Sequence, residues 1–149
     1  MNRNIDNYIP FALPSIDGEE EEAVLSVLRS GWLTTGKEAY AFEQEFSRYV
    51  GSSFALAVNS ATAGLHLALE ALNIQPGDLL ITTPYTFTAT AEVTRYLDAH
   101  PLFVDIENDS FNIDPNEIEK QLEAHKKTGK IKAIIPVHIG GAVCRMDRI

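Results

Sequence analysis

FALAVNSATAGLHLAL, residues 54 to 69, is the stretch that decides the fold. Its first five residues, 54–58, form an apolar run of strand length, and a helix-period segment, 65–74, follows after a loop of small and polar residues. A continuous apolar run is typical of a strand that is buried on both faces. The stretch therefore predicts a strand, a short loop and a helix, which begin a crossover unit of a parallel sheet.

The same alternation of strand and helix continues along the chain. Further apolar runs predict strands over 79–83, 102–106 and 131–138, with helices over 88–99 and 115–125 between them. Four strands that alternate with helices predict an α/β fold with a mostly parallel sheet and flanking helices.

Two helices precede this alternating region. Asp17 and Glu20 have the spacing of a capping box before an apolar helical face, and a second amphipathic helix follows GWLTTG (31–36). We therefore expect an N-terminal segment with two helices, 1–52, and a partial α/β domain, 53–149. We expect the two to form one continuous structural unit.

The loop after the first predicted strand is a candidate anion site, because ligands of parallel sheets bind at the carboxyl ends of strands. Its small residues let backbone amides at a helix start approach a phosphate, and one hydroxyl can add a hydrogen bond. These residues are Ser60, Ala61, Thr62, Ala63 and Gly64. An N-capped helix with small residues for tight packing explains the pattern equally well, since this is neither a Walker loop nor GxGxxG.

Aromatic, histidine and cysteine side chains follow two other predicted strands. Tyr85 and Phe87 lie in the turn after 79–83, where an aromatic ring either stacks on a planar ligand or joins the core. His138 ends the last predicted strand, and a lone histidine there is usually a hydrogen-bonded structural residue. Cys144 has no visible partner base, so we expect it to pack as a small apolar side chain.

Composition narrows the class of protein. The 149 residues are 45% hydrophobic and 22% charged, as in an ordinary globular domain. A formal net charge of −9 argues against nucleic-acid and anionic-membrane binding, since both need a basic face. The start, MNRNIDNYIP, lacks the apolar run of a signal peptide, and the single cysteine excludes an internal disulfide. We expect a cytoplasmic protein without a membrane span or a zinc or calcium motif.

Five motifs follow one another in a characteristic order: GWLTTG with a Phe- and Glu-containing helix, NSATAGLHLAL, TPYTFTATAEV, FVDIENDSFNIDP and IIPVHIGGAVCRMDRI. Together they resemble the DegT/DnrJ/EryC1/StrS aminotransferases. These are sugar aminotransferases of fold type I that depend on pyridoxal phosphate (PLP). The resemblance runs from about Ile9 to Ile149 and rests on several motifs rather than on one.

The resemblance implies a site and a reaction. It implies that the loop Ser60, Ala61, Thr62 and Ala63 holds the PLP phosphate, with Thr62 and Ala63 in contact, and that Phe87 stacks on the pyridine ring. The implied reaction transfers an amino group from glutamate or glutamine to the keto group of a nucleotide-linked sugar, for polysaccharide, glycan or antibiotic synthesis. Family enzymes are homodimers with composite active sites, and GWLTTG lies near that site.

The chain also departs from the family pattern. Ala142, Val143 and Arg145 stand where the family usually has a Gln-Pro pair and an acid, whereas Asp147 fits. Family enzymes are far longer, and the resemblance implies that the Schiff-base lysine and the acid that pairs with the pyridinium nitrogen lie beyond Ile149. None of the six lysines here follows a strand into an apolar pocket. We therefore expect no catalytic residue, and an N-terminal portion of such an enzyme that is inactive by itself.

Two other interpretations stay open. The first is a non-catalytic, self-associating domain, because strands of a larger sheet leave an unpaired edge and apolar faces. The second is a fragment of a PLP-dependent sugar dehydratase or isomerase of the same family, which would need the same further segment.

Overall fold

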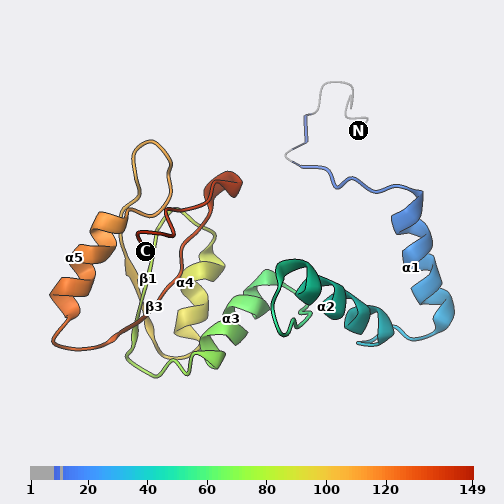
Figure 1. Ribbon diagram of the computed structural model, residues 1–149, viewed down its shortest axis with the longest axis horizontal. Coiled ribbons are helices and arrows are strands. Elements are labelled where there is room, and N and C mark those ends of the chain that lie inside the picture. The colour runs from blue at the N-terminus through green and yellow to red at the C-terminus, as the bar shows by residue number, and fades with distance from the viewer. Residues whose placement is uncertain (1–8, 11) are drawn as a thin grey trace, which may run out of the picture. The chain divides into compact units, whose positions relative to one another are not determined.

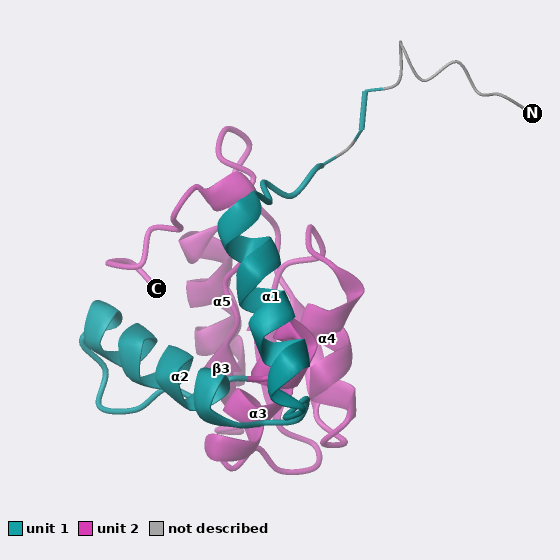
Figure 2. Cartoon of the chain, turned by 90° about the vertical axis from the view of Figure 1, so that its right-hand side faces the viewer, with its two compact units in different colours: residues 1–57 teal, residues 58–149 magenta. Residues whose placement is uncertain are grey.

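The computed structural model describes residues 9, 10 and 12–149. They divide into two compact units, Met1–Ala57 and Val58–Ile149 (Figure 2). The boundary predicted between residues 52 and 53 stays a prediction, and the observed division falls a few residues later. Most of the stretch interpreted as lacking a signal peptide lies outside the described residues.

The first unit contains the two expected helices, α1 (Gly18–Ser30) and α2 (Lys37–Val50). The capping box before α1 is confirmed: the Asp17 carboxylate accepts from the Glu19 amide at 2.9 Å, and the Glu20 carboxylate accepts from the Asp17 amide at 2.8 Å. Within the described part of this unit, α1 has no buried residue and α2 has only Ser47. The apolar faces of both helices are therefore exposed.

The second unit contains a three-stranded parallel sheet in the order β2-β1-β3 (Figure 1). The central strand is β1 (Leu79–Thr82), with β2 (His100–Phe103) and β3 (Ile131–Ile134) as its neighbours. Helices α3 (Ala61–Ala71), α4 (Thr88–Arg95) and α5 (Pro115–His125) connect or precede the strands, and a short 3-10 helix, η2 (Ile139–Gly141), follows β3. The predicted α/β class and the parallel sheet are confirmed.

Neighbouring residues of β1 supply the two halves of the core, because alternate side chains of a strand point to opposite faces of the sheet. Leu80 packs with Leu69 of α3 and Val93 of α4, and all three are almost fully buried. Ile81 points to the other face, where it packs with Ile118 of α5. Helices α3 and α4 thus cover one face of the sheet and α5 covers the other.

The expected strand over 54–58 is wrong. This segment has no strand assignment, and Phe54 and Leu56 are 89% and 72% exposed. The Ala57 amide donates to the Glu43 carboxylate at 2.9 Å rather than to a neighbouring strand. A strand needs a partner for its backbone groups as well as an apolar sequence, and no described segment pairs with this one.

The other expected elements exist with shifted bounds. The third helix begins at Ala61 rather than at Leu65, so the loop NSATAG is largely the first helical turn. The expected strand 131–138 ends at Ile134, and the helix expected over 88–99 ends at Arg95. The expected strand 102–106 is observed as β2, which begins and ends earlier.

Candidate functional site

The first turn of α3 has the geometry of an anion site. Ser60 is the N-cap residue, and its hydroxyl oxygen accepts from the Ala63 amide at 3.1 Å. The Ser60 carbonyl accepts from the Gly64 amide at 3.1 Å. Within the described residues no group accepts from the amides of Ala61 and Thr62, so these two N–H donors remain available at the positive end of the helix dipole.

Tight packing does not explain the glycine in this turn. A Cβ atom added at Gly64 would meet the Val58 side chain at 3.6 Å, which is ordinary van der Waals contact. Alanine would therefore fit there. The space around Gly64 gives no support to the packing explanation that the sequence left open.

The turn after β1 presents an aromatic ring to solvent. Phe87 is the residue before α4 and is 80% exposed. Threonines hold the turn around it: the Thr83 hydroxyl accepts from the Tyr85 amide at 3.2 Å, and the hydroxyls of Thr86 and Thr90 are 2.8 Å apart. A ring displayed in this way can cover one face of a planar ligand.

The two helices that begin at the candidate turns, α3 after Ser60 and α4 after Phe87, belong to the same layer of the second unit. Helix α4 leaves the carboxyl end of β1, whereas α3 leads into the amino end of β1 and packs beside α4 (Figure 1). The first turn of α3 therefore lies toward the edge where α4 begins. No hydrogen bond or ring contact between described residues joins the turn Ser60–Ala63 directly to Phe87, so a ligand would have to bridge them.

His138 and Cys144 are structural, as expected. The Cys144 amide donates to His138 Nδ1 at 3.1 Å, and the Cys144 thiol donates to the Val137 carbonyl at 3.2 Å. Cys144 is 3% exposed and belongs to the core on the α5 face of the sheet. Both residues thus close the loop that follows β3.

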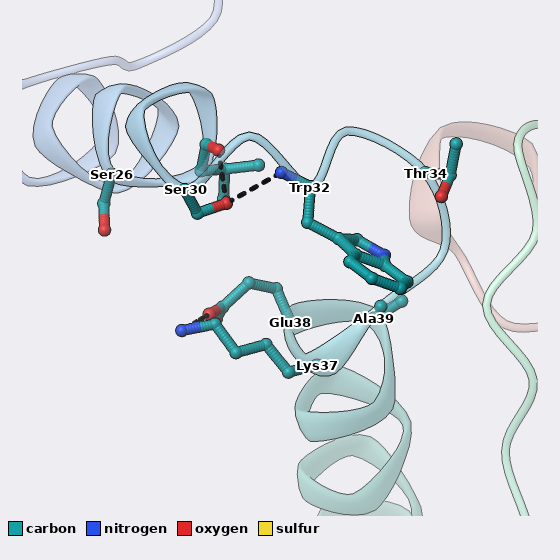
Figure 3. Close-up of a pocket in the computed structure, with 9 residues that line it drawn as sticks. Ser26, Ser30, Trp32, Thr34, Lys37, Glu38 and Ala39 are labelled. Carbon is teal, nitrogen blue, oxygen red and sulfur yellow. Dashed lines mark hydrogen bonds and ion pairs between the residues drawn. The ribbon is translucent and has the colours of Figure 1, made fainter.

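The motif GWLTTG lies in the first unit, where it lines a small pocket between α1 and α2 (Figure 3). The Trp32 indole donates to the Thr35 carbonyl at 3.0 Å, and its ring occupies the space that a Cβ at Gly36 would need, 2.6 Å away. The pocket measures about 60 Å³. Ligand pockets typically have roughly 300 Å³ or more, so this pocket by itself is too small for a sugar.

All six lysines are exposed to solvent. Lys120 is held by Glu117 on the surface of α5; the hydrogen bond and then the charge of Glu117 raise the pKa of the Lys120 ammonium. A Schiff-base lysine requires a lowered pKa. The described residues thus contain no candidate for that role.

Sequence reasoning missed two residues beside this site, Phe111 and Asn112. They lie between β2 and α5, within the motif FVDIENDSFNIDP, where neither residue was assigned a role. Phe111 packs its ring against Tyr85, and Asn112 is 3% exposed with its side chain bonded to the loop after β3. No local pattern in the sequence marks these contacts, because the partners of Asn112 are about thirty residues away.

The fold is that of the PLP-dependent aminotransferases, because solved structures of these enzymes contain the same arrangement of helices and strands. A putative sugar aminotransferase from Streptococcus pneumoniae, in its PMP form, superposes with a TM-score of 0.86 at 40% identity. A model of the DegT/DnrJ/EryC1/StrS aminotransferase family matches residues 14–149, and the chain belongs to that family.

The chain is also similar to two curated proteins. The chain is 44% identical over 149 residues to the spore coat polysaccharide biosynthesis protein SpsC of Bacillus subtilis, and 46% identical over 144 residues to an uncharacterized protein of Methanocaldococcus jannaschii. The matches cover 100% and 97% of this chain but only 37% and 36% of those proteins. The match to the Streptococcus structure covers 94% of this chain and 34% of that one. The chain thus spans about a third of the length of its relatives.

Proposed function

We propose that this chain supplies the phosphate-holding turn and the ring-stacking wall of the PLP site of a sugar aminotransferase. The observation that carries the proposal is the first turn of α3, where two backbone donors without a described partner stand beside the Thr62 hydroxyl. Membership of the family supports it. The Streptococcus aminotransferase has been solved in PLP and PMP forms, so a related chain holds this cofactor.

The proposed roles follow from the chemistry of each residue. Ser60 shapes the turn, and the amides of Ala61 and Thr62 face the phosphate. The Ala63 amide donates to the Ser60 hydroxyl, and the small Ala63 side chain leaves room for the ligand. Phe87 covers one face of the pyridine ring. When bound, PLP supplies an electron sink for carbanion chemistry.

The proposed substrates are a nucleotide-linked keto-sugar and a glutamate or glutamine donor. The relative named for spore coat polysaccharide biosynthesis and the neighbour named as a putative sugar aminotransferase support a sugar rather than a free amino acid. Because no described lysine is suited to hold PLP covalently, we propose that the chain is inactive by itself. A PLP-dependent sugar dehydratase or isomerase of the family would use the same turn and the same ring wall.

A cytoplasmic location is part of the same proposal. It is supported by the single cysteine, Cys144, which is buried and unpaired. No helix in the described ranges has the length and apolar character needed to cross a membrane.

Replacing Thr62 by valine is expected to weaken binding of pyridoxamine phosphate by about tenfold, because a hydrogen bond to a charged group is lost. The ligand is pyridoxamine phosphate because its amine cannot react with surface lysines. Phosphorus NMR titration of the full chain measures the dissociation constant.

Thr128→Val is the matched control, since Thr128 lies on the surface after α5 and bonds only within its own loop. The proposal predicts a selective loss with Thr62→Val. Equal affinity of the two variants would contradict a phosphate role for the α3 turn.

Self-association is a second candidate function, which the exposed apolar faces of the first unit favour. Phe42, Phe46, Tyr49 and Val50 of α2 are each about half exposed or more. A homodimer with a composite active site, as the family resemblance implies, would cover such a surface.

We expect light scattering to give a mass above the 16.5 kDa of one chain. Phe46→Glu is expected to lower the association constant by roughly tenfold or more, because it places a charge on the apolar face. Leu122→Glu, on α5 of the other unit, is the control and is expected to leave the mass unchanged. A monodisperse monomer of the unsubstituted chain would exclude this function.

A further inference from the structure

The segment 106–113 leaves the carboxyl end of β2 and returns as a closed excursion. Ile106 and Ile113 form an antiparallel bridge. Inside it, the Glu107 amide donates to the Asn112 carbonyl at 2.8 Å, and the Phe111 amide donates to the Glu107 carbonyl at 3.1 Å. The excursion therefore has hydrogen bonds of its own between its two arms.

Asn112 connects this excursion to the loop after β3. Its Nδ2 donates to the Ala142 carbonyl at 3.0 Å, and its Oδ1 accepts from the Ile139 amide at 3.0 Å. These two bonds bracket Gly140 and Gly141, both of which have positive φ. Since Asn112 is 3% exposed, water cannot replace either partner, and both ends of the Gly-Gly turn are held by one side chain.

Phe111 connects the same excursion to the loop after β1. Its ring lies 5.9 Å from that of Tyr85, two residues before Phe87, with an interplanar angle of 56°. Its φ is 58°, in the left-handed region that a bulky side chain rarely adopts. A conformation of this kind persists only where surrounding contacts impose it, and such residues concentrate at functional sites.

A further contact fixes the base of the excursion. Arg145, after η2, forms an ion pair with Glu107, whose side chain is 14% exposed. The loops after all three strands are thus joined through one excursion: Tyr85 after β1, Glu107 to Asn112 after β2, and Ile139 to Arg145 after β3.

We propose that Phe111 and Asn112 are positioning residues that preset the carboxyl edge of the sheet for its ligand. Phe111 supports the turn that carries Phe87, and Asn112 holds the Gly140–Gly141 turn. The inference rests on the proposed function, in which this edge receives the cofactor. It adds that the edge is organised by residues that do not themselves touch the ligand.

Hydrogen exchange of single amides, followed by NMR on the full chain, tests the role of Asn112. The Ile139 amide reports on the Asn112 hydrogen bonds, because it donates to the Asn112 side chain. The Ile135 amide is the internal reference, because it donates to the Ile81 carbonyl at 2.8 Å. Asn112→Ala is expected to raise the exchange rate of Ile139 relative to Ile135 by at least about tenfold. Asn112→Asp keeps the acceptor for the Ile139 amide but loses the donor to the Ala142 carbonyl, so it is expected to raise that ratio less than Asn112→Ala does.

The role of Phe111 is tested in the same experiment. Phe111→Leu removes the ring contact and is expected to raise the exchange of the Tyr85 amide by about threefold or more while the Ile139 ratio stays constant. Asn108→Ala, at an exposed position of the same excursion, is the matched control and is expected to change neither amide.

Three results would overturn the inference: an unchanged Ile139 ratio in Asn112→Ala, an equal rise at Ile139 and Ile135, or the same large rise in Asn112→Ala and Asn112→Asp. These exchange rates are measured without PLP. A negative exchange result would therefore overturn the positioning role of Asn112 and Phe111 without affecting the cofactor proposal. A negative pyridoxamine phosphate titration would overturn the cofactor proposal without affecting the hydrogen bonds of Asn112.

Discussion

When the chain is mixed with PLP and reduced with borohydride, we expect no single lysine to be labelled preferentially. We also expect no detectable transamination. Every lysine is exposed to solvent. A protonated amine cannot attack an aldehyde, and a Schiff-base lysine needs a desolvated site that favours its neutral form, which an exposed side chain lacks. At Lys120, the hydrogen bond and the charge of Glu117 raise the pKa of the ammonium. Weak, scattered labelling over several lysines is the expected pattern in a peptide map.

Raising the pH is expected to increase this scattered labelling, with Lys120 labelled least at any pH at which the others begin to react. The pKa of Lys120 is raised by its partner, so its neutral fraction is smaller at each pH. Lys120→Arg serves as the control and is expected to leave the total labelling nearly unchanged. A single dominant adduct that disappears with one Lys→Arg substitution would overturn the proposal that the chain lacks a Schiff-base lysine.

Leu80→Ala is expected to lower the free energy of unfolding by about 2–5 kcal/mol, because it leaves a cavity at the centre of the sheet. Leu80 is 0% exposed and lies between α3 and α4, in contact with the cluster that includes Leu69 and Val93. The cavity would open between the sheet and the layer of α3 and α4. Urea denaturation followed by circular dichroism gives the free energy and the m-value.

The matched control is Leu122→Ala on α5. Leu122 is 41% exposed, so truncating it is expected to cost less than about 1 kcal/mol. A Leu80→Ala variant no less stable than the Leu122→Ala variant would show that β1 is not the centre of the core.

Local signals predicted several elements of both units correctly. The spacing of Asp17 and Glu20 predicted the cap of α1, and Asp114 followed by proline predicted the start of α5. Both signals work within a few residues of chain and need no partner from elsewhere. The apolar runs around Leu80 and Ile131 likewise predicted strands, because each run found a neighbour in the sheet.

The failures share one physical cause, dependence on distant partners. Residues 54–58 are as apolar as β1, yet they form no strand because no described segment pairs with them. The strand β3 is irregular for a similar reason. Its register against β1 shifts between Leu79 and Leu80, and Ile131 and Ile134 therefore pack on the same face of the sheet. Neither pairing nor register is a property of one segment.

The candidate site divides in the same way. Ser60, Ala61, Thr62, Ala63 and Phe87 could be named from sequence, since small residues before a helix and an aromatic after a strand are local patterns. The structure shows the cap, the amides without described partners and the exposed ring, whereas the phosphate and ring-stacking roles stay proposals. Phe111 and Asn112 could not be named, because their contacts join loops that the chain brings together only on folding.

By itself, the sequence determined the α/β class, the capped helices and the family, because helix caps, apolar periods and ordered motifs are properties of short stretches of chain. Only the tertiary structure decided that 54–58 remains unpaired, that α3 begins at Ala61, and that one excursion links the loops after all three strands. Hydrogen bonds between strands and the burial of Asn112 exist only when residues about twenty or more positions apart come together, and no local pattern specifies that meeting.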